Sequence, residues 1–202
     1  RVRLISLDAA NRAWMQGATY REAVGAGSVM AGGAIAEVME SKAPGFGVGD
    51  LVFADTGWQD YAALPGKRLI KVPRVEPLSN LLSVYGIAGL TAYFGLLNVG
   101  KPMAGETVVV SAASGAVGSL VGQIAKLKGC RAVGIAGGRE KCKYVVDELG
   151  FDACVDYKGG NLASELKAAA PNGIDVYFEN VGGEILDTVL LQMNLFGRIP
   201  VC

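Results

Sequence analysis

The stretch Val108-Val-Val-Ser-Ala-Ala-Ser-Gly-Ala-Val-Gly118 decides the fold of this chain. Three β-branched residues in a row are typical of a buried strand, and the small residues that follow them are typical of a tight turn. Apolar residues at helical spacing begin at Val117. The pattern therefore predicts a strand, a tight turn and a helix, the opening of a unit that binds a dinucleotide.

The turn contains two of the three glycines of the G-x-G-x-x-G pattern, as Ala113-x-Gly115-x-x-Gly118. Gly115 would let the backbone approach a pyrophosphate, and Gly118 would let the helix pack closely on its strand. The free N–H groups at the start of the helix would then face the anion. A glycine pattern alone is weak evidence, so the rest of the chain has to support this interpretation.

From residue 107 onward, expected strands alternate with expected helices. The strands are Thr107–Ser111, Arg131–Ala136, Ala153–Tyr157, Ile174–Phe178 and Leu195–Val201. The helices after the first one are Glu140–Leu149, Ala163–Ala170 and Gly183–Met193. This alternation predicts an α/β fold with a doubly wound, parallel sheet of the Rossmann type.

Residues 1–77 are expected to form a separate β-rich domain, a small barrel or sandwich. Its expected strands are Arg1–Ser6, Gly32–Glu40, Leu51–Ala54, Trp58–Leu64 and Leu69–Val72. Trp58 and Tyr61 are expected to pack in the core or on a strand face. The prolines at 73 and 77 mark the boundary, after which Ser79–Asn98 is expected to be mostly helical and residues 78–202 form the second domain.

The composition limits the classes of function. The chain has 202 residues, 51% of them hydrophobic, with 19 basic and 19 acidic residues. Because no basic run is present, nucleic acid is not an expected partner. No apolar run reaches the roughly 20 residues that a membrane-spanning helix needs, so a membrane is not expected either. Both ends of the chain are strand-like, and Arg1 is not an initiator residue, which suggests a segment of a longer protein.

The four cysteines, Cys130, Cys142, Cys154 and Cys202, have no C-x-x-C spacing, and the chain contains no histidine. No metal site is therefore expected in this segment. The cysteines are expected to be reduced, mostly buried thiols in a cytoplasmic protein.

The end of the second strand indicates which nucleotide is bound. An NAD site usually has an acidic residue here, about 20 residues past the glycine turn. This chain instead has Ala136-Gly-Gly-Arg-Glu-Lys141, where Gly137 and Gly138 leave room and Arg139 and Lys141 supply positive charge. A 2′-phosphate would be drawn to these cations, which favours NADP(H). The alternative is an ordinary solvated helix start with surface cations.

The chain resembles the zinc-independent medium-chain dehydrogenase/reductases, and among them the NADP-dependent double-bond reductases: leukotriene B4 12-hydroxydehydrogenase/prostaglandin reductases, plant alkenal reductases and bacterial curcumin reductase. The matching motifs are Ser6-Leu-Asp8, Gly86-Ile-Ala-Gly-Leu-Thr-Ala-Tyr93, Ala112-Ala-Ser-Gly-Ala-Val-Gly118, Ala136-Gly-Gly-Arg-Glu-Lys-Cys142 and Glu179-Asn-Val-Gly-Gly183. The resemblance implies a partial GroES-like substrate domain followed by an NADP-binding Rossmann domain that is incomplete at its C-terminal end.

The resemblance also implies roles for individual residues. The backbone at Gly115, Ala116, Val117 and Gly118 should hold the pyrophosphate. Lys141 should pair with the 2′-phosphate, with room provided by Gly138. Tyr157 should contact the same phosphate, Asn180 should lie near the nicotinamide and Thr91 near its ribose.

Three of these residues also have purely structural interpretations. Tyr157 could be a surface aromatic, and Asn180 could be only a helix N-cap. Thr91 could bond back to its own helix.

The chain departs from the family at Asp8-Ala-Ala-Asn-Arg12, where many relatives have Asp-Pro-Tyr-Met-Arg with a tyrosine that lines the substrate pocket. Asn11 and Arg12 are candidate pocket residues, and no catalytic residue is assigned. The resemblance implies NADPH-dependent reduction of a carbon–carbon double bond in an enone or enal, in a protein that can form a homodimer. The alternatives are a quinone reductase of the ζ-crystallin type and a non-catalytic NADPH-binding module.

Overall fold

The chain forms two compact units in a computed structural model that describes all residues from 1 to 202. The first unit is Arg1–Leu82 and the second is Ser83–Cys202. The proline-rich boundary expected at residue 77 lies five residues before this division. No helix in the structure has the length and the apolar character needed to cross a membrane.

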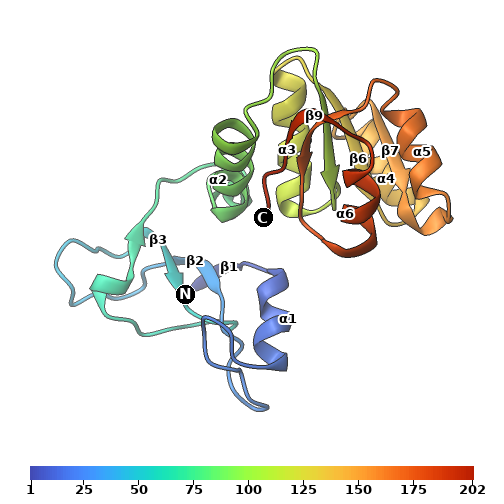
Figure 1. Cartoon of the computed structure of the whole chain (residues 1–202). Helices are drawn as coiled ribbons and strands as arrows, with labels where there is room; N and C mark the ends of the chain where they lie inside the picture. Colours follow the sequence, from blue (N-terminus) through green and yellow to red (C-terminus); the bar gives the residue numbers. More distant parts are fainter. The chain divides into compact units, whose positions relative to one another are not determined.

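The second unit is built on a five-stranded parallel sheet (Figure 1). Its strands are β5 (Thr107–Ser111), β6 (Arg131–Ala136), β7 (Ala153–Asp156), β8 (Ile174–Phe178) and β9 (Met193–Arg198). They lie in the order β7-β6-β5-β8-β9. The chain therefore reverses its direction of winding next to β5, and the carboxyl ends of β5 and β8 flank the switch point where such sheets bind ligands.

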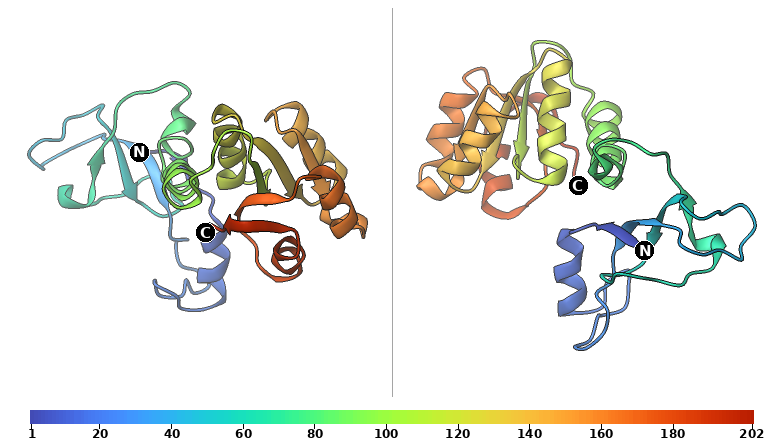
Figure 2. Two further views of the ribbon diagram at one scale, coloured as in Figure 1. Left: turned by 45° about the horizontal axis from the view of Figure 1, so that its top comes forward. Right: turned by 180° about the vertical axis from the view of Figure 1, so that it is seen from behind.

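Helices cover both faces of this sheet, as the two views of Figure 2 show. One face is covered by α2 (Ile87–Phe94), which continues as a π-helix over Gly95–Gly100, and by α3 (Ala116–Leu127) and α4 (Arg139–Asp147). The other face is covered by α5 (Leu162–Ala169), which follows a 3-10 turn at Tyr157–Gly159, and by α6 (Gly183–Leu190). The α/β, doubly wound prediction is confirmed.

The valine run explains why β5 is the central strand. Val108, Val109 and Val110 have no exposed surface. Val108 and Val110 belong to the core under α2, α3 and α4, whereas Val109 belongs to the core under α5 and α6. Because alternate residues of a strand point to opposite faces, only a continuous apolar run can fill both cores.

The first unit contains a four-stranded antiparallel sheet in the order β1-β2-β3-β4. Its strands are β1 (Val2–Ile5), β2 (Gly33–Glu37), β3 (Leu51–Asp55) and β4 (Ile70–Lys71). A helix that the sequence did not predict, α1 (Ala9–Gln16), follows β1, and short 3-10 helices occupy Gly66–Arg68 and Leu78–Leu81.

The strand expected at Trp58–Leu64 is absent, and that prediction is wrong. The chain turns at this point, because the N–H of Gln59 donates to the carbonyl of Gly57 and the side chain of Thr56 donates to the same carbonyl. Trp58 and Tyr61 are 39% and 62% exposed, so they are not core residues.

The expected helix at Ser79–Asn98 is also interrupted. The α-helical part begins only at Ile87, after turns at Ser83–Gly86. Gly89 packs against this turn. A Cβ at position 89 would lie 1.9 Å from the carbonyl oxygen of Val84, so the close contact between the helix and the turn requires glycine.

Candidate functional site

The turn after β5 brings backbone groups into unusually close contact. Ala112 has a φ of 48°, a conformation rare for residues other than glycine, and its carbonyl accepts the N–H of Gly115 at 2.8 Å. A Cβ at Gly118 would lie 2.4 Å from that carbonyl oxygen. Only glycine fits at 118, so the structure gives the last glycine of the motif the close-packing role that the sequence predicts.

The amino end of α3 presents unused hydrogen-bond donors. Gly115 is the N-cap residue and no side chain caps the helix. The first N–H to find a partner in the helix is that of Ser119, which donates to the carbonyl of Gly115 at 3.0 Å. The preceding N–H groups, those of Ala116, Val117 and Gly118, point out of the helix end, as the geometry of an α-helix requires. Such donors, together with the helix dipole, are suited to an anion.

A buried carboxylate joins β8 to β5 beside this turn. Glu179 is 3% exposed, and its Oε1 accepts the hydroxyl of Ser111 at 3.2 Å and the N–H of Gly182 at 2.7 Å. The N–H of Val181 donates to the same oxygen. Burial raises the pKa of Glu179, but Tyr177 and these donors together outweigh it, so the pKa lies below its ordinary value.

The second carboxylate oxygen of Glu179 is less well satisfied. Oε2 and the hydroxyl of Tyr177 are buried, and neither has a hydrogen-bond partner of good geometry. Tyr177 is nevertheless near enough to contribute to the lowering of the Glu179 pKa, and burial raises its own pKa strongly.

Asn180 is fixed at the switch point by the same serine. Its side-chain amide donates to the carbonyl of Ser111 at 2.8 Å, and its own N–H donates to the Ser111 hydroxyl at 2.8 Å. The N-cap of α6 is Gly182, so Asn180 is not the N-cap. The carboxamide oxygen of Asn180 makes no hydrogen bond within the chain and remains available to a ligand.

The end of β6 is tied to the end of β7 by an acid that the sequence analysis missed. Gly138 has a φ of 100° and donates its N–H to Oδ1 of Asp156 at 2.7 Å. Oδ1 also accepts the N–H of Lys158 at 3.0 Å, and these donors hold the pKa of Asp156 below its ordinary value, that of Gly138 most strongly. The sequence alone does not place Asp156 beside Gly138, because the two residues come together only through the pairing of Ala136 in β6 with Asp156 in β7.

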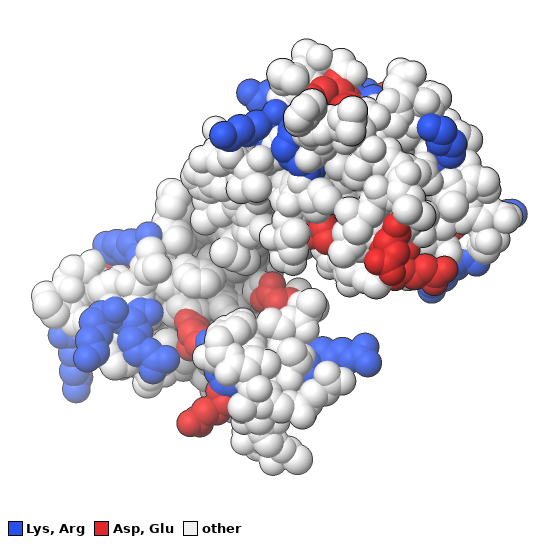
Figure 3. All heavy atoms as spheres, viewed as in Figure 1, with Lys and Arg blue, Asp and Glu red and all other residues white.

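Lys141 lies in the first turn of α4, where the sequence places it. Lys141 and Arg139 are both exposed, and neither forms an ion pair in the structure. In the view of Figure 3, acidic side chains of the second unit gather at its lower edge, and basic side chains lie mainly at its upper left and at its right.

Tyr157 follows β7 and is 42% exposed. Its ring covers Gly137, since a Cβ built there would lie 2.9 Å from the ring and 3.0 Å from the hydroxyl oxygen. Tyr157 also lines an open groove of about 380 Å³ between the start of α5 and α6. It is therefore a partly packed aromatic at the same sheet edge as Gly138.

Thr91 lies on α2, which packs against α3. Its side chain is half-buried and makes no hydrogen bond, so it does not bond back to its own helix. The structure thus brings the turn at 112–118, Asn180, Gly138, Lys141 and Tyr157 to the carboxyl edge of one sheet, and places Thr91 on a helix beside α3.

In the first unit, Asn11 has a structural role. It is 5% exposed, its side chain accepts the N–H of Asp8 at 2.6 Å and it donates to the carbonyl of Ala31 at 2.9 Å. Both ends of the amide are used within the unit, whereas Arg12 is exposed.

No group of three or more His, Cys, Asp or Glu side chains could hold a metal ion anywhere in residues 1–202. The four cysteines are free thiols. Only Cys130 is buried, so the expectation that most of them are buried is wrong.

The doubly wound sheet, the close glycine turn and the uncapped helix at the switch point define a nucleotide-binding α/β protein. Residues 1–72 match the model of the N-terminal domain of oxidoreductase, and residues 116–202 match that of the zinc-binding dehydrogenase. The NADPH-dependent curcumin reductase of Escherichia coli is 49% identical over 91% of this chain and 54% of its own length. The NADP(+)-dependent 2-alkenal reductase of Nicotiana tabacum is 48% identical over the same shares.

Among solved structures, CurA from Vibrio vulnificus in complex with NADPH has a TM-score of 0.92 and 48% identity, covering 100% of this chain and 60% of that one. The chain therefore belongs to the medium-chain dehydrogenase/reductase family, in the group that contains these reductases, and the resemblance is confirmed. It spans about half the length of the curated relatives it matches.

Proposed function

We propose that the protein that carries this chain is an NADPH-dependent reductase of carbon–carbon double bonds conjugated to a carbonyl. The observation that carries the proposal is the uncapped amino end of α3 at the switch point, with the unpaired cation of Lys141 at the next strand end. The names of the relatives support the proposal. The curcumin reductase and the 2-alkenal reductase are each named as dependent on NADPH or NADP(+), and CurA has a structure in complex with NADPH.

The chain's own groups fit NADPH in a consistent order along the sheet edge. The N–H groups of Ala116, Val117 and Gly118 would hold the pyrophosphate. Lys141 would pair with the 2′-phosphate, for which Gly138 leaves open space. Tyr157 would lie against the same phosphate.

At the other end of the site, the free carboxamide oxygen of Asn180 would accept a hydrogen bond from the nicotinamide amide. Thr91 would contact the neighbouring ribose. Residues 1–77 would form the partial GroES-like substrate domain, and residues 78–202 the nucleotide domain.

Bound NADPH supplies the hydride, which adds to the β-carbon of the substrate. The protein's contribution is to position the two reactants and to exclude water. Negative charge develops on the carbonyl oxygen of the substrate, and a nearby hydrogen-bond donor must stabilise it. We assign no residue of this segment to that task. We also propose that the reaction proceeds without zinc, because the segment has no histidine and no cluster of metal ligands.

A turnover screen tests this proposal. The complete purified protein is mixed with NADPH or NADH and with a 2-alkenal, an enone or a quinone, and loss of the reduced cofactor is followed by absorbance. We expect turnover with alkenals and enones and a preference for NADPH. Turnover with quinones alone would establish the quinone reductase instead, and tight NADPH binding without turnover would establish a non-catalytic module.

We further propose, first, that the protein is cytoplasmic and acts on small molecules, with neither nucleic acid nor a membrane as a partner. Second, we propose that it forms a homodimer. The balanced charge and the free cysteines support the first part. Sedimentation of the complete protein tests the second.

A further inference from the structure

Two cysteines that are 12 residues apart in the sequence lie side by side between α4 and β7. Cys142 is on α4 and Cys154 is on β7, and the thiol of Cys154 donates to Sγ of Cys142 at 3.0 Å. Sulfur atoms in a disulfide are about 2.05 Å apart, so a movement of about 1 Å would allow the bond to form. Because α4 packs directly on β7, the backbone already holds the pair in place.

We propose that Cys142 and Cys154 are a redox modification site that closes to an intramolecular disulfide, with a peroxide as the oxidant. The thiolate of Cys142 attacks one oxygen of hydrogen peroxide, the O–O bond breaks, and Cys142 becomes a sulfenic acid while the other oxygen leaves as water after protonation. Cys154 then attacks the sulfenic sulfur, the S–S bond forms, and the hydroxyl leaves with the Cys154 proton as a second water. The two thiols are oxidised by two electrons and the peroxide is reduced by two.

The positions of the two residues assign their roles. Cys142 is the fourth residue of α4, and its side chain is not among those packed against the core beneath that helix. Cys154 packs against the core formed with α2, α3 and α4, and burial raises its pKa. Cys142 is therefore the thiol that meets the oxidant, and Cys154 is the thiol that resolves the sulfenic acid.

The other two cysteines have no such arrangement. Cys130 is buried, and its thiol donates to the carbonyl of Met103. Cys202 is exposed but has no contact with another cysteine. The proposed site goes beyond the proposed reductase activity, because its chemistry needs neither NADPH nor an enone. It would nevertheless tie α4 to β7 close to the hydrogen bond between Gly138 and Asp156.

Peptide mapping without reduction tests the site in the complete protein after treatment with hydrogen peroxide. We expect one peptide pair linked through Cys142 and Cys154, and its release by dithiothreitol. In the Cys154→Ser variant the disulfide should be lost, and dimedone should trap a sulfenic acid at Cys142. In the matched control, Cys202→Ser, the disulfide should form as in the unchanged protein.

Three results would overturn the proposal. The first is the absence of the linked pair under conditions that oxidise the exposed Cys202. The second is a linkage that uses Cys130 or Cys202 instead. The third is trapping of the sulfenic acid at Cys154 but not at Cys142. The mapping of the unchanged protein decides the first two results even if a serine variant does not fold, and dimedone added to the unchanged protein together with the peroxide decides the third.

Discussion

The hydroxyl of Ser111, the last residue of β5, donates to the carboxylate of Glu179, the first residue after β8, at 3.2 Å. The same hydroxyl accepts the N–H of Asn180 at 2.8 Å. The two strand ends that flank the switch point are thus fixed to each other by side chains as well as by the sheet. The carboxylate also holds the turn that leads into α6, through the N–H groups of Val181 and Gly182. We infer that Glu179 positions Asn180 and does not itself contact a ligand.

This role predicts the effect of Glu179→Gln. The variant keeps the volume of the side chain but replaces a charged acceptor by a neutral one, so the bonds from Ser111 and Gly182 weaken. We expect the free energy of unfolding to fall by about 1–3 kcal/mol. We also expect NADPH to bind more weakly, because Asn180 and the turn lose their fixed position. Urea unfolding and titration with NADPH measure the two effects.

The control for this prediction is Glu184→Gln. Glu184 is exposed in the first turn of α6, and its side chain makes no contact with the turn. Its replacement should change neither quantity measurably. Equal losses of stability and of NADPH affinity in the two variants would show that these quantities depend on the net charge of the protein and not on the hydrogen bonds of Glu179.

The second prediction concerns the unpaired cation at the start of α4. In Lys141→Ala, a charge-assisted contact to the 2′-phosphate is removed. Contacts of this kind contribute about 1.5–3 kcal/mol, so we expect NADPH to bind about 10- to 100-fold more weakly. NADH, which lacks the phosphate, should bind almost unchanged. Isothermal titration with both cofactors separates the two cases.

Lys128 supplies the matched control for Lys141. It is exposed at the carboxyl end of α3, away from the strand ends that form the site. Lys128→Ala should leave the affinity for both cofactors unchanged. A loss of affinity for NADPH and NADH alike in Lys141→Ala would refute the assignment of the 2′-phosphate.

The third prediction tests the close contact of α3 with the turn after β5. Alanine normally stabilises a helix interior by about 1 kcal/mol relative to glycine. In Gly118→Ala, however, the new methyl group would lie 2.4 Å from the carbonyl oxygen of Ala112, so the helix must move away. We expect a loss of about 1–3 kcal/mol in the free energy of unfolding, measured by urea titration.

Gly25→Ala is the control for the third prediction, because nothing lies within 4 Å of a Cβ at Gly25. It should leave stability close to that of the unchanged protein. If Gly118→Ala were as stable as Gly25→Ala, the contact with Ala112 would not constrain position 118.

The sequence predicts the second unit well because its signals are local. The valine run at 108–110 and the helical spacing that follows are each contained in one stretch, and parallel order follows from the alternation of strands and helices. The first unit is predicted less well. Its aromatic segment at 58–64 has a strand-like composition, but hydrogen bonds within Thr56–Gln59 turn the chain instead.

The relations that build the site are not visible in the sequence, because they depend on register between strands. Asp156 could not be placed beside Gly138 without the pairing of β6 with β7. Glu179 stood out only as part of a motif, and its bond to Ser111 follows from the pairing of β5 with β8. The contact of Cys142 with Cys154 likewise needs the packing of α4 on β7.

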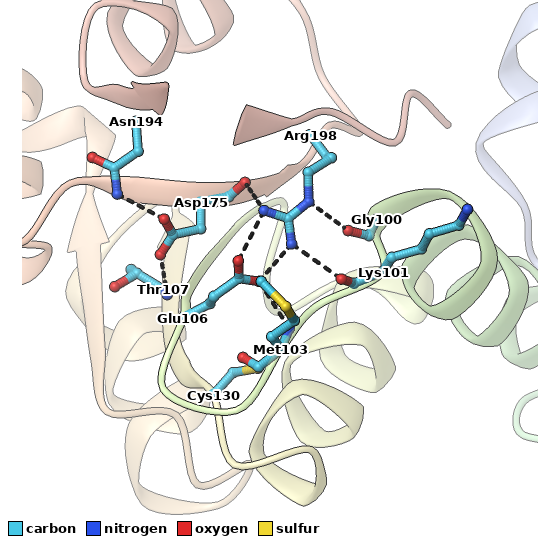
Figure 4. Close-up of polar contacts among 9 residues, drawn as sticks. All are labelled: Gly100, Lys101, Met103, Glu106, Thr107, Cys130, Asp175, Asn194 and Arg198. Carbon is cyan, nitrogen blue, oxygen red and sulfur yellow. Dashed lines mark hydrogen bonds and ion pairs between the residues drawn. The ribbon is translucent and has the colours of Figure 1, made fainter. Parts of the chain in front are cut away.

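The last prediction concerns the pairing of Arg198 with Glu106, which lies outside the candidate site (Figure 4). The guanidinium of Arg198 donates to both carboxylate oxygens of Glu106, the first at 3.0 Å, and to the carbonyls of Gly100 and Lys101, each at 3.0 Å. The two side chains are 27% and 13% exposed. The bond from Arg198 is the main cause of the lowered pKa of Glu106, and it outweighs the opposing effect of burial.

Arg198→Met removes every one of these donors and leaves a partly buried carboxylate. We expect the free energy of unfolding at about pH 7 to fall by about 2–3 kcal/mol. As a control, Lys143→Met breaks an exposed pair with Asp147 and should leave the free energy of unfolding nearly unchanged.

The pH dependence separates the ion pair from simple packing. Because the folded state lowers the pKa of Glu106, its contribution is present in full above the ordinary value of 4.5 and is lost as the pH falls through the folded value. The difference in unfolding free energy between the unchanged protein and Arg198→Met should therefore shrink below about pH 4.5. Urea titrations at a series of pH values measure it, and a difference that stays constant down to acid pH would mean that Arg198 stabilises the fold only through the carbonyls of Gly100, Lys101 and Asp175.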